Sequence, residues 1–449
     1  MRPRRCTGCR SARRLRRSGN RTSRTSRTAR AAAAALGALA TLGAGAPPAA
    51  QAQTAAVREH ARGTVVAVSV RLPTGSAADP VGREGTSWLL AHALADLADT
   101  VLDTTRVALS VEVTRGTTVF TLLAVPEAWA DAVGALLEII FRAVPPDAVV
   151  ERRRARLLGE LSFERGAPVR AFEAEVARIL VPAGDAWSRP IRGDSGSVAA
   201  VSAADLTAYR ADHYHMSEAA IGVVGPARRD VVAAVLPAPP LADQAEAPSR
   251  APGPTPDLPA WITGDRYRLV RQVTATWMAV AYPVRPSTSR TDLEFLMHLV
   301  RDDLSPSPPD PDVYGVDVHI EDTPQGAALV IDAVVFPEAA ARVEARILDV
   351  VHRLGVGELD DPLFRWRRRR FRTERLLAEA APEAQARRIT ADLLRAGAPR
   401  RLGVDIWALD PPGLKAAAAG LGAPRILIFG PDLGQAGGRS GAEIGRAHV

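Results

Sequence analysis

Cysteine and lysine are nearly missing from this chain, and their scarcity narrows the chemistry that it can carry. Cys6 and Cys9 are the only cysteines in 449 residues, and Lys415 is the only lysine. Both cysteines lie within the first 52 residues, so a chain without that segment has no thiol, disulfide or cysteine-ligated metal. The sequence also lacks the phosphate-binding glycine motifs and the Gly-x-Ser-x-Gly motif of serine hydrolases. These absences exclude the commonest nucleotide sites and serine-nucleophile sites.

The first 52 residues have the composition of an export signal. They contain 12 arginines and no acidic residue, and they end with an apolar run from Ala31 to Ala44 followed by Ala50-Gln51-Ala52. A basic segment, a short apolar segment and a small-residue cleavage site in this order are typical of secretory signals. We therefore predict a signal peptide over residues 1–52 and an exported protein, periplasmic or extracellular. No later stretch is apolar for roughly 18 residues, so we expect no transmembrane span after leader removal.

The net charge of +7 belongs to this leader. The leader holds 12 of the 57 basic residues and none of the 50 acidic ones, so the remainder has a small acidic excess. A basic excess confined to the leader gives no reason to expect a nucleic-acid partner, and we predict none. The run Arg367–Arg370 lies among Phe364, Trp366 and Phe371, which is typical of the solvated face of an amphipathic helix.

The remaining chain consists of two similar halves on either side of a Pro/Ala-rich linker at residues 236–261. In each half a β-rich run ends at Pro-Glu and passes into a helical pattern, an Arg-rich helix follows, and a short apolar strand ends in Gly-Pro. The corresponding prolines are Pro126 and Pro337, then Pro226 and Pro431. Four features in the same order indicate an internal duplication.

The order of strand and helix patterns in each half predicts the same α+β unit. The order of elements is strand, helix, two strands, several helices and a closing strand, and strands that follow one another without a helix pair most simply as antiparallel neighbours. We therefore predict two homologous domains, at residues 60–235 and 262–435, each a mainly antiparallel sheet with helices packed on one face. Residues 436–449 are expected to form a flexible tail.

One segment of the first half carries a recognisable chemical pattern, Gly85-Thr-Ser-Trp88-Leu-Leu-Ala91-His92. It resembles the inverted zinc-binding helix of the insulinase/pitrilysin-like (inverzincin) metallopeptidases, in which His-x-x-Glu-His follows a glycine. Histidines four residues apart share one helix face and can hold one zinc, while the glutamate polarises the attacking water. The resemblance extends over roughly residues 60–435 and implies that family's fold, with zinc as the family cofactor.

The segment departs from the motif at two of its three positions. Trp88 stands in place of the first histidine ligand and Ala91 in place of the general base, so only His92 matches. Glu160 is the best match for the family's third ligand, which lies on a later helix. A catalytic zinc needs three protein ligands and an open position. The resemblance therefore implies a non-catalytic member with no catalytic residue, no cofactor and a vestigial metal site at His92 and Glu160.

Simpler roles for these residues remain open. His92 can be a partly buried helix residue with one hydrogen bond, and Glu160 can form a helix-surface ion pair. The resemblance also implies a substrate-binding tyrosine in the second half, matched by Tyr314, although the arginine that accompanies it in the family is missing from residues 304–311. Tyr314 can equally be an aromatic residue that packs its ring at a strand start.

These features favour a structural or peptide-contacting partner of an active, homologous zinc peptidase subunit. The resemblance implies a chamber built from homologous units, and a unit without metal can still bind extended peptides there by strand addition. Extended peptides are therefore a second expected partner. Two alternatives remain: a solitary exported binding or scaffold protein on the same fold, and an active zinc metallopeptidase with atypical ligands.

Overall fold

The computed structural model describes residues 54–236, 265–305, 308–356, 361–397, 399 and 404–432. The predicted signal peptide, nearly all of the predicted linker and the predicted tail lie outside the described residues.

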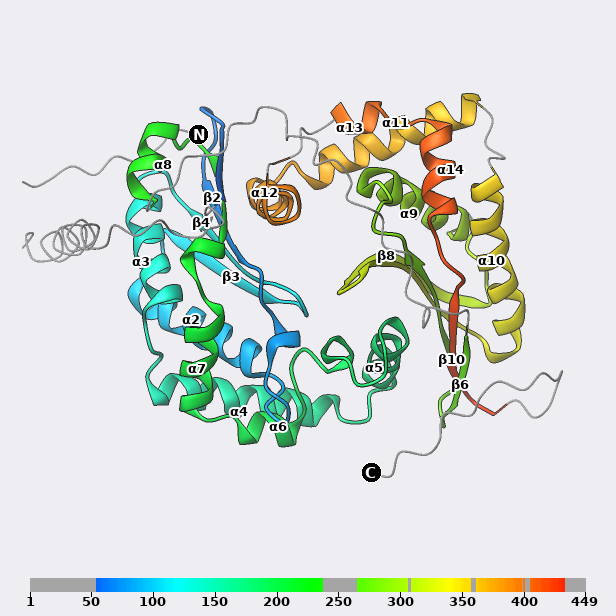
Figure 1. Cartoon of the computed structure of the whole chain (residues 1–449), viewed down its shortest axis with the longest axis horizontal. Coiled ribbons are helices and arrows are strands. Elements are labelled where there is room, and N and C mark those ends of the chain that lie inside the picture. The colour runs from blue at the N-terminus through cyan, green and yellow to red at the C-terminus, as the bar shows by residue number, and fades with distance from the viewer. Residues whose placement is uncertain are drawn as a thin grey trace, which may run out of the picture. The chain divides into compact units, whose positions relative to one another are not determined.

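The first half is built on a five-stranded mixed sheet (Figure 1). The strand order is β1-β5-β2-β4-β3; β1 and β5 are parallel, and every other neighbouring pair is antiparallel. The strands are β1 (Thr54–Glu59), β2 (Val66–Leu72), β3 (Val107–Val113), β4 (Thr118–Ala124) and β5 (Ala220–Gly225). We call this the first sheet.

The helices of the first half follow the predicted order. They are α2 (Thr86–Val101), α3 (Trp129–Phe141), α4 (Asp147–Glu164), α5 (Pro168–Leu180), α6 (Ser195–Ala200), α7 (Ala203–His213) and α8 (Arg229–Val235), with short 3-10 turns η1 (Ser76–Ala78), η2 (Ala186–Ser188) and η3 (Met216–Glu218).

The second half repeats this topology. Its sheet, the second sheet, has the order β6-β10-β7-β9-β8, which is the order of the first sheet with each strand replaced by its counterpart. The strands are β6 (Arg266–Val270), β7 (Thr276–Val284), β8 (Val313–Thr323), β9 (Gly326–Val335) and β10 (Arg425–Gly430). The helices are α9 (Arg290–Leu304), α10 (Ala340–Val356), α11 (Asp361–Ala378), α12 (Pro382–Ala396), α13 (Val404–Trp407) and α14 (Pro411–Ala419), with the turn η4 (Pro337–Ala339).

The corresponding prolines occupy the same places in the two halves. Pro126 and Pro337 each follow the fourth strand of their half and precede the next helix, and Pro226 and Pro431 each follow the closing strand. The parallel edge strands β1 and β6 were not predicted from the sequence. Strand β1 also begins before residue 60, where the first domain was predicted to start.

Alternation along β2 explains how the first sheet is covered on both faces. Val66, Val68 and Val70 are fully buried in the core formed with the half's own helices. The residues between them are small or polar, and they face α12 from the second half: Ala67 packs in a cluster with α12, and Ser69 contacts Thr390 at 3.2 Å. The pattern Val-Ala-Val-Ser-Val thus reflects two different neighbours.

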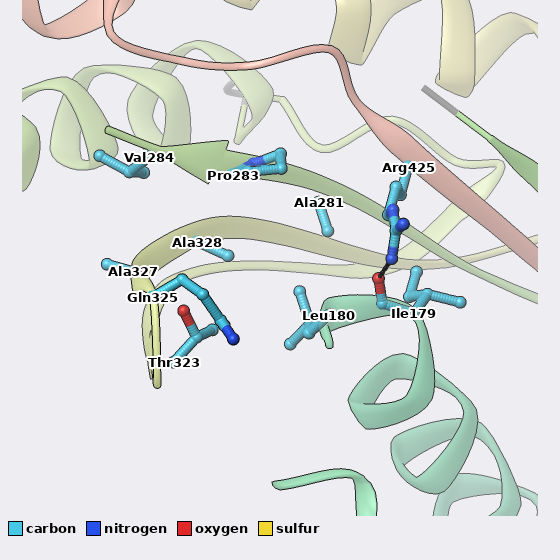
Figure 2. A pocket seen from close by; sticks show the side chains of 10 residues that line it. All are labelled: Ile179, Leu180, Ala281, Pro283, Val284, Thr323, Gln325, Ala327, Ala328 and Arg425. Atoms are coloured by element: carbon cyan, nitrogen blue, oxygen red, sulfur yellow. Dashed lines mark hydrogen bonds between the residues drawn. The ribbon is translucent and has the colours of Figure 1, made fainter. Parts of the chain in front are cut away.

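The two halves exchange one helix each. Helix α12 buries Ala386, Ile389 and Leu393 against the first sheet, and its counterpart α5 buries Phe172, Val176 and Ile179 against the second sheet. Figure 2 shows the end of α5 beneath the second sheet, where Arg425 donates a hydrogen bond to the Ile179 carbonyl. Each sheet is therefore covered by its own helices on one face and by a helix of the other half on the opposite face.

Within the described residues, no helix is both long and apolar enough to span a membrane.

Candidate functional site

The start of α2 is fixed by a buried carboxylate. Asp79, only 3% exposed, accepts hydrogen bonds from the backbone N–H groups of Gly85 (2.7 Å) and Ser87 (2.8 Å). Burial raises the pKa of Asp79 to about 6, although these two hydrogen bonds act in the opposite direction. Gly85 has φ of +95° and lies so close to the Arg192 carbonyl that an added Cβ would be 2.6 Å from its oxygen. This anchoring sets the register of Trp88, Ala91 and His92.

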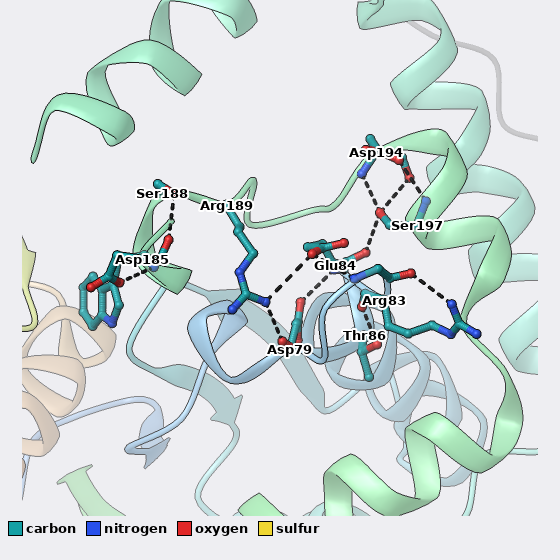
Figure 3. Close-up of polar contacts among 12 residues, drawn as sticks. Asp79, Arg83, Glu84, Thr86, Asp185, Ser188, Arg189, Asp194 and Ser197 are labelled. Atoms are coloured by element: carbon teal, nitrogen blue, oxygen red, sulfur yellow. Dashed lines mark hydrogen bonds and ion pairs between the residues drawn. The ribbon is translucent and has the colours of Figure 1, made fainter. Parts of the chain in front are cut away.

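A loop after α5 is bonded to the same region (Figure 3). Arg189 donates a hydrogen bond to the Asp79 carbonyl at 2.8 Å, and its guanidinium lies 3.8 Å from the Glu84 carboxylate. Ser197 donates to the Glu84 carbonyl at 3.0 Å, while Asp194 caps α6. The loop is therefore held against the start of α2, and Arg192 lies between its two attachment points.

Trp88 and His92 form a stacked pair on α2. They are one helical turn apart, their ring centroids are 3.8 Å apart, and the rings are inclined by 29°. Burial, and secondarily the positive charge of Arg153, lowers the pKa of His92 to about 4, so the imidazole is neutral near pH 7. Ala91 is fully buried in the hydrophobic core of the first half.

Arg192 connects Glu160 to this pair. Glu160, on α4, forms ion pairs with Arg192 and with Arg156, the latter at 3.2 Å. Arg192 also pairs with Glu164 at 3.0 Å, and its guanidinium carbon lies 5.5 Å from the Trp88 ring centroid. The structure therefore brings Trp88, His92 and Glu160 into one connected group, with an arginine between the carboxylate and the aromatic rings.

These residues do not fit a catalytic zinc. One imidazole is present, and its ring is stacked on an indole; the candidate carboxylate already bonds two guanidinium groups; and the base position carries a buried methyl group. In the part of the chain that the structure describes, no group of three or more His, Cys, Asp or Glu side chains has a metal-binding arrangement.

Tyr314 lies elsewhere, on β8 in the second half. It is 61% exposed, and its ring centroid is 4.7 Å from that of Phe336. A cavity of about 810 Å³ opens beside Trp88, and Tyr314 is not among the residues that line it. The position where the family's arginine is expected includes Ser307, which lies outside the described residues. The contact with Phe336 corresponds to the packing role that the sequence left open for Tyr314.

The cavity beside Trp88 is lined by both halves. The first half contributes the end of α4, the start of α5 and the loop at residues 188–195, and the second half contributes Arg271, Gln272, Val273 and Phe429. Neither this cavity nor the role of Arg192 was predicted from the sequence. Arg192 is about a hundred residues from Trp88 in sequence and belongs to no motif, so no local signal could reveal their contact.

Comparisons with known proteins identify the fold. No family model and no curated protein sequence matches the chain. Among solved structures, a peptidase M16 inactive domain from Pseudomonas fluorescens superposes with a TM-score of 0.68 and 15% identity, over 88% of this chain and 99% of that one. The chain has the M16 peptidase fold. This confirms the insulinase/pitrilysin-like fold that was expected from the resemblance of the segment around Trp88 and His92 to the zinc-binding helix.

Two further structures share the M16 fold with this chain. One is from complex III2 of Candida albicans with Inz-5 bound, with a TM-score of 0.66 and 14% identity over 84% of this chain and 93% of that one. The other is the periplasmic protease PqqL from Escherichia coli, with a TM-score of 0.63 and 13% identity over 82% of this chain and 43% of that one. At these identities the likeness establishes the fold, and the roles assigned to individual site residues stay predictions.

Proposed function

We propose that this protein is an exported, non-catalytic M16-fold protein that serves as a structural or peptide-contacting partner of an active zinc peptidase. One observation carries the proposal: Ala91, at the position of the general base, has no group that could take a proton from water and is fully buried. Glu160, the candidate ligand, is already bound to two arginines.

Each of three similar structures supports one part of this proposal: inactivity, assembly with partners, or a place outside the cytoplasm. One is a peptidase M16 inactive domain, one comes from complex III2, and one is a periplasmic protease. A unit without catalytic residues can still form part of the wall of a shared chamber. Two of its four edge strands, β3 and β8, pair on one side only within the described residues and can accept an extended peptide by strand addition.

Purification from the native host tests this proposal. The protein, tagged at its C-terminus, is isolated with and without mild crosslinking, and bound proteins are identified by mass spectrometry against an unrelated exported protein with the same tag. We expect a homologue with an intact His-x-x-Glu-His motif. A protein that elutes alone as a monomer in both preparations would instead support the solitary scaffold. Peptide cleavage by the isolated protein, abolished in His92→Ala, would overturn the non-catalytic assignment.

A further inference from the structure

The cavity beside Trp88 is rich in arginine. Six arginines and three acidic residues line it, and its volume of about 810 Å³ is in the range of sites that hold small ligands or short peptide segments. Such an excess of positive charge in a concave site attracts anionic groups.

The acidic side chains of the cavity wall are already bonded within the protein. Glu164 pairs with Arg170 and Arg192, both at 3.0 Å. Glu173 pairs with Arg170 at 2.8 Å, and Asp194 accepts hydrogen bonds from two backbone N–H groups at the start of α6. The three carboxylates are thus already bonded to arginines or backbone N–H groups of the protein itself.

Two of the arginines, one from each half, have no carboxylate partner among the described residues. Arg165 donates to the Ser195 hydroxyl at 3.2 Å, and Arg271 donates to the Val270 carbonyl at 3.0 Å. The Arg271 guanidinium also lies 5.8 Å from the ring centroid of Phe429. Both side chains retain N–H donors for a ligand, since a guanidinium carries five.

Apolar side chains form another part of the wall. Phe429, Ala177 and Val113 are 1%, 4% and 9% exposed, and the indole of Trp88 faces the same space. A ligand that fills this cavity therefore contacts apolar surface and guanidinium groups together.

We propose that this cavity binds an acidic peptide segment that also carries apolar side chains, with Arg165 and Arg271 as its ion-pairing residues. The inference rests on the proposed peptide-contacting function and names the class of peptide. Because the two arginines belong to different halves, a ligand that pairs with both must reach from one wall to the other, as an extended segment with spaced carboxylates does. Arginine suits this role because its planar fork matches a carboxylate.

Fluorescence anisotropy with three labelled hexapeptides tests the proposal. The protein used is the chain without its predicted signal peptide, residues 53–449. The peptides alternate Phe with Glu, Gln or Lys and have blocked ends. We expect the Glu peptide to bind most tightly and to weaken as salt is raised. The double variant Arg165→Glu/Arg271→Glu should lose at least about tenfold in affinity for it, corresponding to about 1.4 kcal/mol. Arg369→Glu, an exposed arginine on α11 outside the cavity, is the matched control and should bind as the unmodified protein does.

Three results would overturn the proposal: equal binding of the Glu and Lys peptides, unchanged affinity in a folded double variant, or binding of a fatty acid such as laurate with no binding of any peptide. Circular dichroism checks that each variant is folded. Failure here leaves the proposed function intact if the active homologue still co-purifies, so the two proposals fail separately.

Discussion

At the scale of single residues, the cation that Glu160 binds is an arginine, Arg192. In a zinc site the carboxylate would bind a divalent cation; here it binds the guanidinium of Arg192, which also lies over the Trp88 ring. Restoring the motif alone leaves this cation in position. If Glu160 is the third ligand, as the resemblance implies, metal binding depends on Arg192 as well as on the motif.

This leads to a prediction about zinc. The unmodified protein should purify without stoichiometric zinc, because His92 and Glu160 are too few ligands. Trp88→His/Ala91→Glu restores the motif but should bind zinc weakly, and adding Arg192→Leu should strengthen binding by at least about tenfold, corresponding to about 1.4 kcal/mol. Isothermal calorimetry of both variants measures this. The control replaces Arg192→Leu by Arg165→Leu, a neighbouring arginine whose hydrogen bond is to the Ser195 hydroxyl and not to Glu160. Equal zinc affinity with either leucine change would refute the role of Arg192.

Asp79 gives a prediction about pH. Its pKa is about 6 in the folded protein and close to 4 in an unfolded chain. Between these values the folded state binds a proton that the unfolded state does not, so the Asp79 contribution to the free energy of unfolding rises as pH falls from about 6 to 4. The gain is at most roughly 3 kcal/mol. Urea unfolding at several pH values should show it in the unmodified protein and not in Asp79→Asn; identical pH profiles would contradict the assignment.

At the scale of elements, the contact between α12 and the first sheet depends on a missing side chain. Gly222 of β5 lies under α12, and an added Cβ would be 2.7 Å from the Ala386 carbonyl oxygen. Gly222→Ala should therefore lower the free energy of unfolding by about 1–3 kcal/mol, as overpacking does. The control is Gly134→Ala on α3, where an added Cβ meets nothing within 4 Å, and this change should raise it by about 0.5–1 kcal/mol. Urea denaturation compares the two; a neutral Gly222→Ala would mean that α12 packs less closely.

The sequence predicts a helix or strand well where the periodicity of its apolar residues reflects packing against a single core. The helix with Trp88 and His92, the closing strands and the repeated Pro-Glu starts all follow from local periodicity. Strand β1 is short, directly follows the predicted signal peptide in the sequence, and pairs with β5, about 160 residues away. No local pattern therefore identifies it. The stacking of Trp88 on His92 follows from their spacing of one turn, whereas Arg192 reaches them only through tertiary folding.

At the scale of the whole molecule, the exchange of α5 and α12 makes each half a part of the other's structure. Each sheet would otherwise expose an apolar face, at a cost of about 25 cal/mol per Å². Residues 53–249 and 250–449, expressed as separate chains, should therefore co-purify as a one-to-one complex. Size-exclusion chromatography measures this. Ile389→Asp, which places a charge at a buried α12 position, should separate the fragments. Glu383→Gln, an isosteric change at the half-buried first turn of α12, should not. Fragments that elute apart without any substitution would refute the prediction.

The strand order also bears on how the chain folds. In each sheet the last strand made, β5 or β10, lies between the two strands made first. The place of this strand stays empty until about 160 residues after the first strand have been synthesised. Both sheets therefore depend on contacts between residues far apart in the sequence, and such contacts slow folding. Neither sheet can therefore be completed before its closing strand has left the ribosome, which places the folding of each half near the end of that half's own translation.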